Sequence, residues 1–140
     1  MAQVKAIHVQ GITFMSVGDS KTWVSMDGPE TFGGSESGVS PKELILHALA
    51  GCTGSDVASL LTKMRVPFTR FEVTINAEIA EEHPKVYTEI EIVYTFWGEG
   101  LDTKKIERAI DLSENTYCPV NAMLKKVVPI TTKYKLNPAQ

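Results

Sequence analysis

Apolar residues recur at helical spacing between Ser40 and Arg65, which predicts that this segment is the longest element of the chain. Ser40, Pro41 and Glu43 are typical of a helix start: a serine cap accepts backbone N–H groups, proline fits the first helical position, and a glutamate at the third can reach back. Pro67 marks the end. The pattern predicts a central helix of about 24 residues, roughly 36 Å long at 1.5 Å per residue.

The middle of this helix consists of small residues around a cysteine. Alanine, glycine and serine dominate positions 48–55, and Gly51 and Gly54 flank Cys52. Glycine inside a helix costs roughly 1 kcal/mol relative to alanine. Two glycines here indicate that another segment approaches the helix backbone closely and leaves the sulfur room to meet a partner.

Alternation with a period of two predicts the strands. Residues 3–26 are expected to form a small antiparallel meander with a turn at Gly18, Asp19 and Ser20. Residues 71–79 and 86–96 each place apolar side chains on one face, and the polar segment between them makes a turn. The two runs predict a hairpin with one dry face and one charged face.

The C-terminal third predicts two more helices and a closing strand. Asp102 is expected to cap the first helix, which should break at Cys118 because the residue before a proline leaves the α region. A short helix then follows up to Pro129, and residues 130–136 form the strand. The expected buried stripe of the first helix is Ile106, Ala109, Ile110, Ser113 and Tyr117. This order of elements predicts a single α+β domain over residues 1–140.

Composition places the chain among ordinary globular proteins. It has 140 residues, 43% hydrophobic and 22% charged, and the net charge of −3 is spread along the chain. No basic stripe is available to meet phosphates, so we expect no nucleic-acid partner. The N-terminus has no apolar signal core, and no run was expected to approach membrane-spanning length. The interpretation is a cytoplasmic protein without a membrane partner.

A near match to a phosphate-binding loop lies before the central helix. The segment GGSESGVS, residues 33–40, has the glycines and the final serine of that motif, and a helix follows it. However, Val39 stands where the motif needs its lysine, and no buried strand precedes the loop. The interpretation is therefore a loop that ends in a helix cap.

The two cysteines, Cys52 and Cys118, are the residues whose type and setting suggest chemistry. They lie 66 positions apart (118 minus 52), and two cysteines do not make a disulfide scaffold. From the residues alone, three readings stay open: inert small hydrophobes, a redox or nucleophilic pair, or part of a metal site. The last lacks further ligands, because zinc requires four and His47 lies off the face of Cys52.

The two cysteine segments together resemble the OsmC/Ohr family of small thiol peroxidases. The matching motifs are P-x-E-L-x-L-x-A-L-A-G-C in the first long helix and Y-C-P-V-x-x-M-L much later, and the resemblance runs from Val4 to Leu136. It implies an α+β fold with antiparallel sheets around a long central helix, in an intertwined homodimer. The pattern is closer to the YhfA-like branch of the family than to OsmC or Ohr proper.

The resemblance also implies roles for both cysteines and names the partners. Cys52 would attack an organic hydroperoxide and become a sulfenic acid, and Cys118 would condense with it as the resolving cysteine. No bound cofactor is implied. A small dithiol or a lipoylated protein would reduce the resulting disulfide.

Two departures from the family pattern concern the activation of the attacking thiol. Active relatives use an N-terminal arginine, but this chain has no arginine before Arg65. They also carry an acidic residue directly after the helix-start proline, where this chain has Lys42, and the glutamate follows one place later. Glu43 is therefore the third candidate catalytic residue, and peroxide reduction is expected to be inefficient.

Electrostatics from the sequence favour the other thiol. Asp56 lies one helical turn after Cys52 and would disfavour a thiolate there unless it is itself paired. Cys118 is expected at a helix N-terminus, where free N–H groups and the macrodipole favour a thiolate. This argument predicts that Cys118 is the more acidic thiol, whereas the resemblance makes Cys52 the attacker.

A second functional class fits the same residues. The chain could be a binding protein that holds a small apolar or acyl ligand, with the cysteines serving structure or redox sensing. The aromatic and methionine side chains that would line its pocket are Phe14, Trp23, Met26 and Phe32, although core packing explains them equally well.

Overall fold

The computed structural model describes residues 1–139, which form two compact units. The first unit comprises Met1–His47, and the second begins at Ala48. Helix α1 (Pro41–Lys63) begins in the first unit and continues into the second. With 23 residues and this start, α1 confirms the predicted long helix.

The first unit is built on an antiparallel meander of β1 (Val4–Gln10), β2 (Thr13–Gly18) and β3 (Trp23–Met26) in that order. The predicted meander is confirmed, but it has one more turn than the alternation indicated. The chain turns at Gly11, whose φ is +49°, and a Cβ there would lie 2.5 Å from the carbonyl oxygen of Gly33. Glycine is required at this position because the conformation and the close approach both exclude a side chain.

The loop that resembles a phosphate-binding loop surrounds a carboxylate of its own chain. The Asp27 carboxylate accepts hydrogen bonds from Gly28 N–H and from both the backbone N–H and the hydroxyl of Ser35 and Ser37, at 2.7–3.1 Å. Asp27 itself is 3% exposed. The glycine- and serine-rich segment therefore does form an anion cage, and the anion inside it is Asp27.

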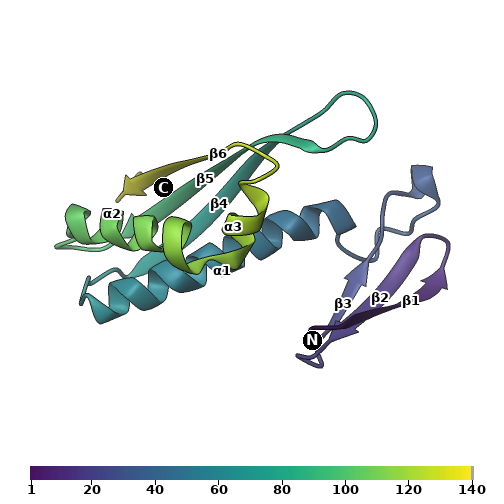
Figure 1. The fold of residues 1–140 in the computed structure, drawn as a ribbon, viewed down its shortest axis with the longest axis horizontal. Coiled ribbons are helices and arrows are strands. Elements are labelled where there is room, and N and C mark those ends of the chain that lie inside the picture. The colour runs from purple at the N-terminus through teal and green to yellow at the C-terminus, as the bar shows by residue number, and fades with distance from the viewer. Residues whose placement is uncertain (140) are drawn as a thin grey trace. The chain divides into compact units, whose positions relative to one another are not determined.

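The second unit is a three-stranded sheet with helices on one face (Figure 1). The strands are β4 (Arg70–Ile79), β5 (Tyr87–Trp97) and β6 (Ile130–Leu136), in the order β4-β5-β6. The helices are the second part of α1, α2 (Thr103–Leu112) and α3 (Pro119–Leu124). Strands β4 and β5 form the predicted antiparallel hairpin, with Phe71 opposite Phe96.

Strand β6 departs from the expectation of antiparallel sheets, because it pairs with β5 in parallel, with Tyr94 opposite Tyr134. The segment between β5 and β6 contains α2 and α3. A helical crossover of this length returns the chain to the starting end of the sheet, so that the next strand runs in the same direction. The overall class, α+β with two small sheets, is the one predicted.

The core of the second unit lies between this sheet and its helices. Strand β5 is the central strand, and its side chains Ile90, Ile92, Tyr94 and Phe96 are fully buried. The buried residues of α1 recur every fourth position: Leu49, Thr53, Val57 and Leu61. Burying an aliphatic or aromatic side chain of this size stabilises a fold by about 1.5–3 kcal/mol, which fixes α1 against the sheet.

Helix α2 ends in a π-helical turn, η2 (Ser113–Tyr117), which changes the expected stripe. Asp102 caps α2 as predicted, accepting from the backbone N–H of Lys105. Ile106, Ala109, Ile110 and Ser113 are buried, but Tyr117 is 54% exposed. The i→i+5 bonding of a π turn widens the helix and shifts the phase of the residues that follow, so the prediction for Tyr117 was wrong.

By length and composition, α1 could cross a membrane. Its most apolar 18-residue window has a mean hydropathy of 1.4, and 22% of that window is buried within this chain. The expectation that no segment approaches membrane-spanning length is therefore wrong as far as length and apolar composition are concerned. A helix that packs one face against a sheet can have the same length and hydropathy. The second part of α1 packs in this way through Leu49, Val57 and Leu61.

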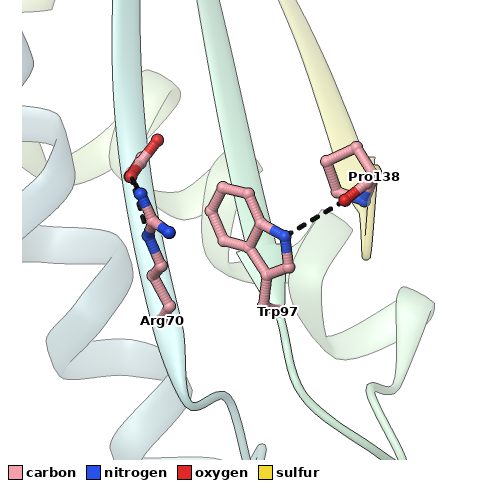
Figure 2. Close-up of polar contacts among 4 residues, drawn as sticks. Arg70, Trp97 and Pro138 are labelled. Atoms are coloured by element: carbon pink, nitrogen blue, oxygen red, sulfur yellow. Dashed lines mark hydrogen bonds and ion pairs between the residues drawn. The ribbon is translucent and has the colours of Figure 1, made fainter. Parts of the chain in front are cut away.

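A polar cluster closes the end of the second sheet (Figure 2). The Arg70 guanidinium on β4 binds Glu72 and lies 4.7 Å from the ring centre of Trp97 on β5. The Trp97 indole N–H donates to the carbonyl oxygen of Pro138 at 3.3 Å. These contacts link the edge strand to the segment after β6.

Candidate functional site

Cys52 lies in the middle of α1 and is half-buried. It stands next to Thr53, which belongs to the buried face of the helix. The expected close approach is confirmed at Gly54, where a Cβ would lie 3.2 Å from a methyl of Val73 on β4. It is wrong for Gly51, where a Cβ would meet nothing within 4 Å in this chain.

Cys118 lies between the π turn and α3, where its backbone is extended (φ −73°, ψ 103°) as expected before a proline. Its N–H donates to the carbonyl oxygen of Ser113 at 2.9 Å, and its sulfur accepts from the N–H of Asn121 at 3.4 Å. Cys118 is 2% exposed. The thiol is thus held at the N-cap of α3 and covered by its surroundings.

The two thiols lie near each other. The Cys52 side chain is one of the causes that raise the pKa of the Cys118 thiol, and both cysteines are free. The fold therefore places near each other two thiols that are 66 positions apart in the sequence (118 minus 52). That they can form a disulfide, which requires Cα atoms within about 7 Å of each other, stays a prediction.

The expectation that the helix N-terminus would make Cys118 acidic, by lowering its pKa, is wrong. Burial, followed by the hydrogen bond with Cys52, raises the pKa of Cys118 from 9.0 to about 11. The N–H groups of Asn121 and Val120 lower it, but they do not compensate. Because desolvation penalises the charged form, and because α3 has only six residues, the helix N-terminus does not make this thiol acidic.

Behind the thiols lies a chain of hydroxyl groups that sequence reasoning missed. The Ser113 hydroxyl donates to the Asp56 carboxylate at 3.2 Å and lies 2.9 Å from the Thr53 hydroxyl, which in turn contacts the phenol of Tyr94. Asp56 therefore has a hydrogen-bond partner in Ser113. The available signal was a polar residue at an apolar repeat position: Thr53 between Leu49 and Val57.

The third candidate, Glu43, lies in the first unit. Its carboxylate faces the ring of His47 one turn later, at 3.2 Å, and both side chains are more than half exposed. The structure thus gives Glu43 a partner on its own helix, while the cysteine pair belongs to the second unit. The aromatic residues proposed to line a ligand pocket, Phe14, Trp23 and Phe32, are exposed by 38%, 51% and 76%.

A cavity of about 350 Å³ opens beside the hydroxyl chain and is lined by Asp56, Ser59, Leu60, Lys63 and Tyr117. Among residues 1–139, no group of three or more histidine, cysteine or acidic side chains is arranged to hold a metal ion.

Comparison with known proteins gives consistent results. A family model described as OsmC-like protein matches residues 33–133. Protein YhfA of Escherichia coli (strain K12) is 35% identical over 134 residues, which cover 96% of this chain and 97% of that protein.

Solved structures share the fold over the whole chain. A hypothetical protein from Aquifex aeolicus VF5 superposes with a TM-score of 0.84 at 28% identity, covering 100% of this chain and 98% of the other. An organic hydroperoxide resistance protein OsmC from Legionella pneumophila superposes with a TM-score of 0.68 at 14% identity, covering 96% of each chain. At the lower identity, the likeness concerns the fold alone.

Proposed function

The chain belongs to the OsmC-like protein family, and from this premise we propose that it reduces organic hydroperoxides with Cys52 and Cys118 as a redox pair. Solved structures with the same fold include proteins named for organic hydroperoxide resistance. Membership of this family supports a part in the response to oxidative stress. The specific chemistry is inferred from the site.

The single observation that carries the proposal is the proximity of the two thiols, which is close enough for Cys52 to raise the pKa of Cys118. Two isolated cysteines that served only as small hydrophobes would have no reason to meet. Exposure supports these roles: Cys52 is half-buried and Cys118 is 2% exposed. A substrate can therefore reach Cys52 first, while Cys118, with its raised pKa, remains a thiol that can resolve the intermediate.

The reaction balances in two steps. The Cys52 thiolate attacks the terminal oxygen of the hydroperoxide; an S–O bond forms, the O–O bond breaks, and the alkoxide leaves and takes up a proton to become the alcohol. Cys52 is then a sulfenic acid. The Cys118 sulfur attacks the Cys52 sulfur, forming the disulfide, while the sulfenic hydroxyl leaves with the Cys118 proton as water.

An external dithiol completes the cycle. Its first thiolate attacks the Cys52–Cys118 disulfide, which forms a mixed disulfide with one cysteine and releases the other. Its second thiolate then attacks the mixed disulfide, which releases the remaining cysteine and leaves the reductant as a cyclic disulfide. A small dithiol or a lipoyl group on a protein has this chemistry. The enzyme itself needs no bound cofactor for these steps.

Turnover is expected to be slow. A thiol attacks peroxide as its thiolate, and relatives favour that form with an N-terminal arginine. This chain has no arginine before Arg65. Glu43 stays the third candidate catalytic residue on the family pattern alone. Its partner here is His47, at 3.2 Å.

We also propose that the protein is a homodimer. Within one chain, only 22% of the apolar window of α1 is buried. The meander of the first unit exposes further large apolar side chains: Val4, Ile7, Val9, Ile12 and Trp23. Apolar surface of this kind marks an interface. Sedimentation at low micromolar concentration tests this, and a folded monomer would exclude it.

A steady-state assay with cumene hydroperoxide and dihydrolipoamide tests the function. The wild type should consume hydroperoxide in excess over protein. Cys52→Ser should lose all consumption above background, because no other described thiol is accessible. Cys118→Ser should complete one reaction per chain and then accumulate Cys52 oxidised beyond the sulfenic acid.

Stoichiometric consumption without turnover by the wild type would favour the redox-sensing alternative instead. Full activity in Cys52→Ser would remove the assigned attacker. A Cys118→Ser protein that resists over-oxidation under excess peroxide would show that the two cysteines do not act as a pair.

A further inference from the structure

Four polar side chains form a continuous chain through the interior of the second unit. Tyr94 on β5, Thr53 on α1 and Ser113 in η2 are fully buried. Tyr94 contacts Thr53, Thr53 lies 2.9 Å from Ser113, and Ser113 bonds to Asp56 at 3.2 Å. The chain thus joins a strand, the π turn and two successive turns of α1.

The hydrogen bonds along this chain of hydroxyl groups all run in one donor-to-acceptor direction, from Tyr94 to Asp56. Each hydroxyl has a single proton to donate, and a carboxylate oxygen only accepts. Ser113 gives its proton to Asp56, so Thr53 must donate to Ser113. Tyr94 must then donate to Thr53. The carboxylate at one end therefore fixes the orientation of every hydroxyl behind it.

This arrangement is more specific than stability alone requires. Burying a hydroxyl without a partner costs about 1–3 kcal/mol, so every member needs the others in place. Apolar residues of the same shape could fill this space with nearly the same stability. A fully bonded polar network instead permits one relative position of the helix and the turn.

The two middle members of the chain, Thr53 and Ser113, adjoin the two cysteines. Thr53 directly follows Cys52 in α1, and the carbonyl oxygen of Ser113 accepts the N–H of Cys118 at 2.9 Å. That bond closes the π turn. Such turns are rare and frequently lie at functional sites. The opposite side of the turn is also fixed, because Glu114 accepts a hydrogen bond from Thr132 on β6.

We propose that Thr53, Ser113 and Asp56 are positioning residues whose hydrogen-bonded chain fixes the π turn against α1 and so presents the Cys118 thiol to Cys52. The hydroxyl of Ser113 ties the turn to α1, and its carbonyl oxygen ties Cys118 to the turn. Loss of the hydroxyl bonds leaves the thiols present but less often in contact. This inference rests on the proposed redox pairing of the two cysteines.

The test measures how readily the two thiols form a disulfide, without any hydroperoxide. Each protein is equilibrated in glutathione redox buffers, and the fraction of Cys52–Cys118 disulfide gives the effective concentration of one thiol at the other. Ser113→Ala and Thr53→Val should lower this value about tenfold, since each removes a link of the chain. Thermal unfolding confirms that each variant is folded at the temperature used.

Two matched variants serve as controls. Thr53→Ser keeps the hydroxyl and should stay within about twofold of the wild type. Ser55→Ala lies three positions after Cys52, but the Ser55 hydroxyl donates only to Gly51 within the same helix and is exposed, so it should also change nothing. If Ser113→Ala fails to fold, the contrast between Thr53→Val and Thr53→Ser decides the question.

Peroxidase activity is measured separately on the same proteins. If the wild type forms the disulfide in glutathione buffers but consumes no hydroperoxide, the proposed function fails and the positioning inference stands. If folded Ser113→Ala and Thr53→Val have the same effective concentration as the wild type, the positioning inference is wrong, whatever the activity. A loss in Thr53→Ser or Ser55→Ala equal to that in Thr53→Val would also overturn it.

Discussion

The two units each contain a carboxylate that accepts hydrogen bonds from serine hydroxyls. The two clusters differ in how far apart in the sequence their bonded residues lie. In the first unit, Asp27 accepts from Gly28, Ser35 and Ser37, all within ten positions of it in the sequence. In the second, Asp56 accepts from Ser113, and the bonds continue to Thr53 and Tyr94. The first cluster is a closed cage within one loop, whereas the second is a chain across three elements.

This difference indicates different purposes. A cage of local donors fixes the conformation of the loop that contains it, and its contribution is to stability. The chain connects residues that are 41–60 positions apart and passes beside both cysteines, so that it fixes one element relative to another. We call the effective concentration of one thiol of the Cys52–Cys118 pair at the other their thiol coupling. If the two clusters differ in this way, variants of the cage should change stability alone, and variants of the chain of hydroxyl groups should change thiol coupling.

The largest effect is expected at the cage. Asp27→Ala leaves the N–H groups of Gly28, Ser35 and Ser37 without their acceptor in a loop where Asp27 is 3% exposed. We expect thermal unfolding to occur at least about 5 °C lower. The effective concentration of the Cys52–Cys118 pair should be unchanged in the folded protein. A large change in that value would mean that the cage also positions the thiols.

The same cage gives a pH dependence with a defined sign. Hydrogen bonds, the one from the Ser37 side chain first, outweigh burial and hold the pKa of Asp27 well below its ordinary value of 3.8. A carboxyl whose pKa is lowered by folding contributes stability that is fully present above its unfolded value and is lost as the pH falls toward the folded value. The urea midpoints of wild type and Asp27→Asn should therefore converge below about pH 4. A constant difference down to pH 2 would contradict this.

The sequence predicted the elements better than it predicted the site. The strands, α1, the Asp102 cap and the break at Cys118 follow from local patterns of apolar residues, caps and prolines, and these survive folding because they depend on neighbours in the sequence. The motif that resembled a phosphate-binding loop was also local. The interpretation from the sequence was a loop that ends in a helix cap, because the sequence could not show that Asp27 lies inside the loop as its anion.

The errors concern quantities that depend on packing. Tyr117 was placed on the buried stripe because a π turn cannot be recognised from the 3.6-residue period. Cys118 was expected to be acidic because a helix N-terminus is visible in the sequence, whereas burial is not. The parallel pairing of β6 and the chain from Tyr94 to Asp56 likewise require knowledge of which distant elements meet.

The next effect concerns the reactivity of Cys118. Burial and the hydrogen bond with Cys52 raise its pKa from 9.0 to about 11, so its thiolate fraction at neutral pH should be about 100-fold lower than that of an ordinary cysteine. Alkylation of native protein, followed at the Cys118 peptide by mass spectrometry, should rise with pH up to about 11. The urea-unfolded protein should show the ordinary midpoint.

Cys52→Ala provides the control for this measurement. It removes the second cause of the shift and leaves burial, so the midpoint for Cys118 should fall only part of the way toward 9.0. A native midpoint below 9 would show that the N–H groups at the start of α3 dominate after all. The sequence-based expectation for this thiol would then be restored.

A smaller effect is expected at the far end of the hydroxyl chain. Tyr94→Phe removes only the first donor, and the bonds from Thr53 to Ser113 and from Ser113 to Asp56 remain. We expect a loss of about 1 kcal/mol in the free energy of unfolding, and less than a twofold change in thiol coupling. Urea unfolding and glutathione equilibration give the two values. A tenfold loss of coupling would place Tyr94 among the positioning residues.

The smallest effect is expected at the exposed cluster around Arg70 (Figure 2). This cluster tests whether the contribution of the two carboxylate clusters depends on their burial. The Arg70 and Glu72 side chains are 54% and 45% exposed, and ion pairs of this kind contribute about 0–1 kcal/mol. The contact with Trp97 adds about 0.5–1 kcal/mol at an exposed site. Arg70→Ala should therefore lower the free energy of unfolding by about 1 kcal/mol, Glu72→Gln by less, and neither should change thiol coupling.

Urea unfolding at low and high salt measures both losses, and the part due to the ion pair should shrink in salt. A loss as large as that of Asp27→Ala would show that an exposed polar cluster can matter as much as a buried one, and the comparison between cage and chain would then need another physical basis.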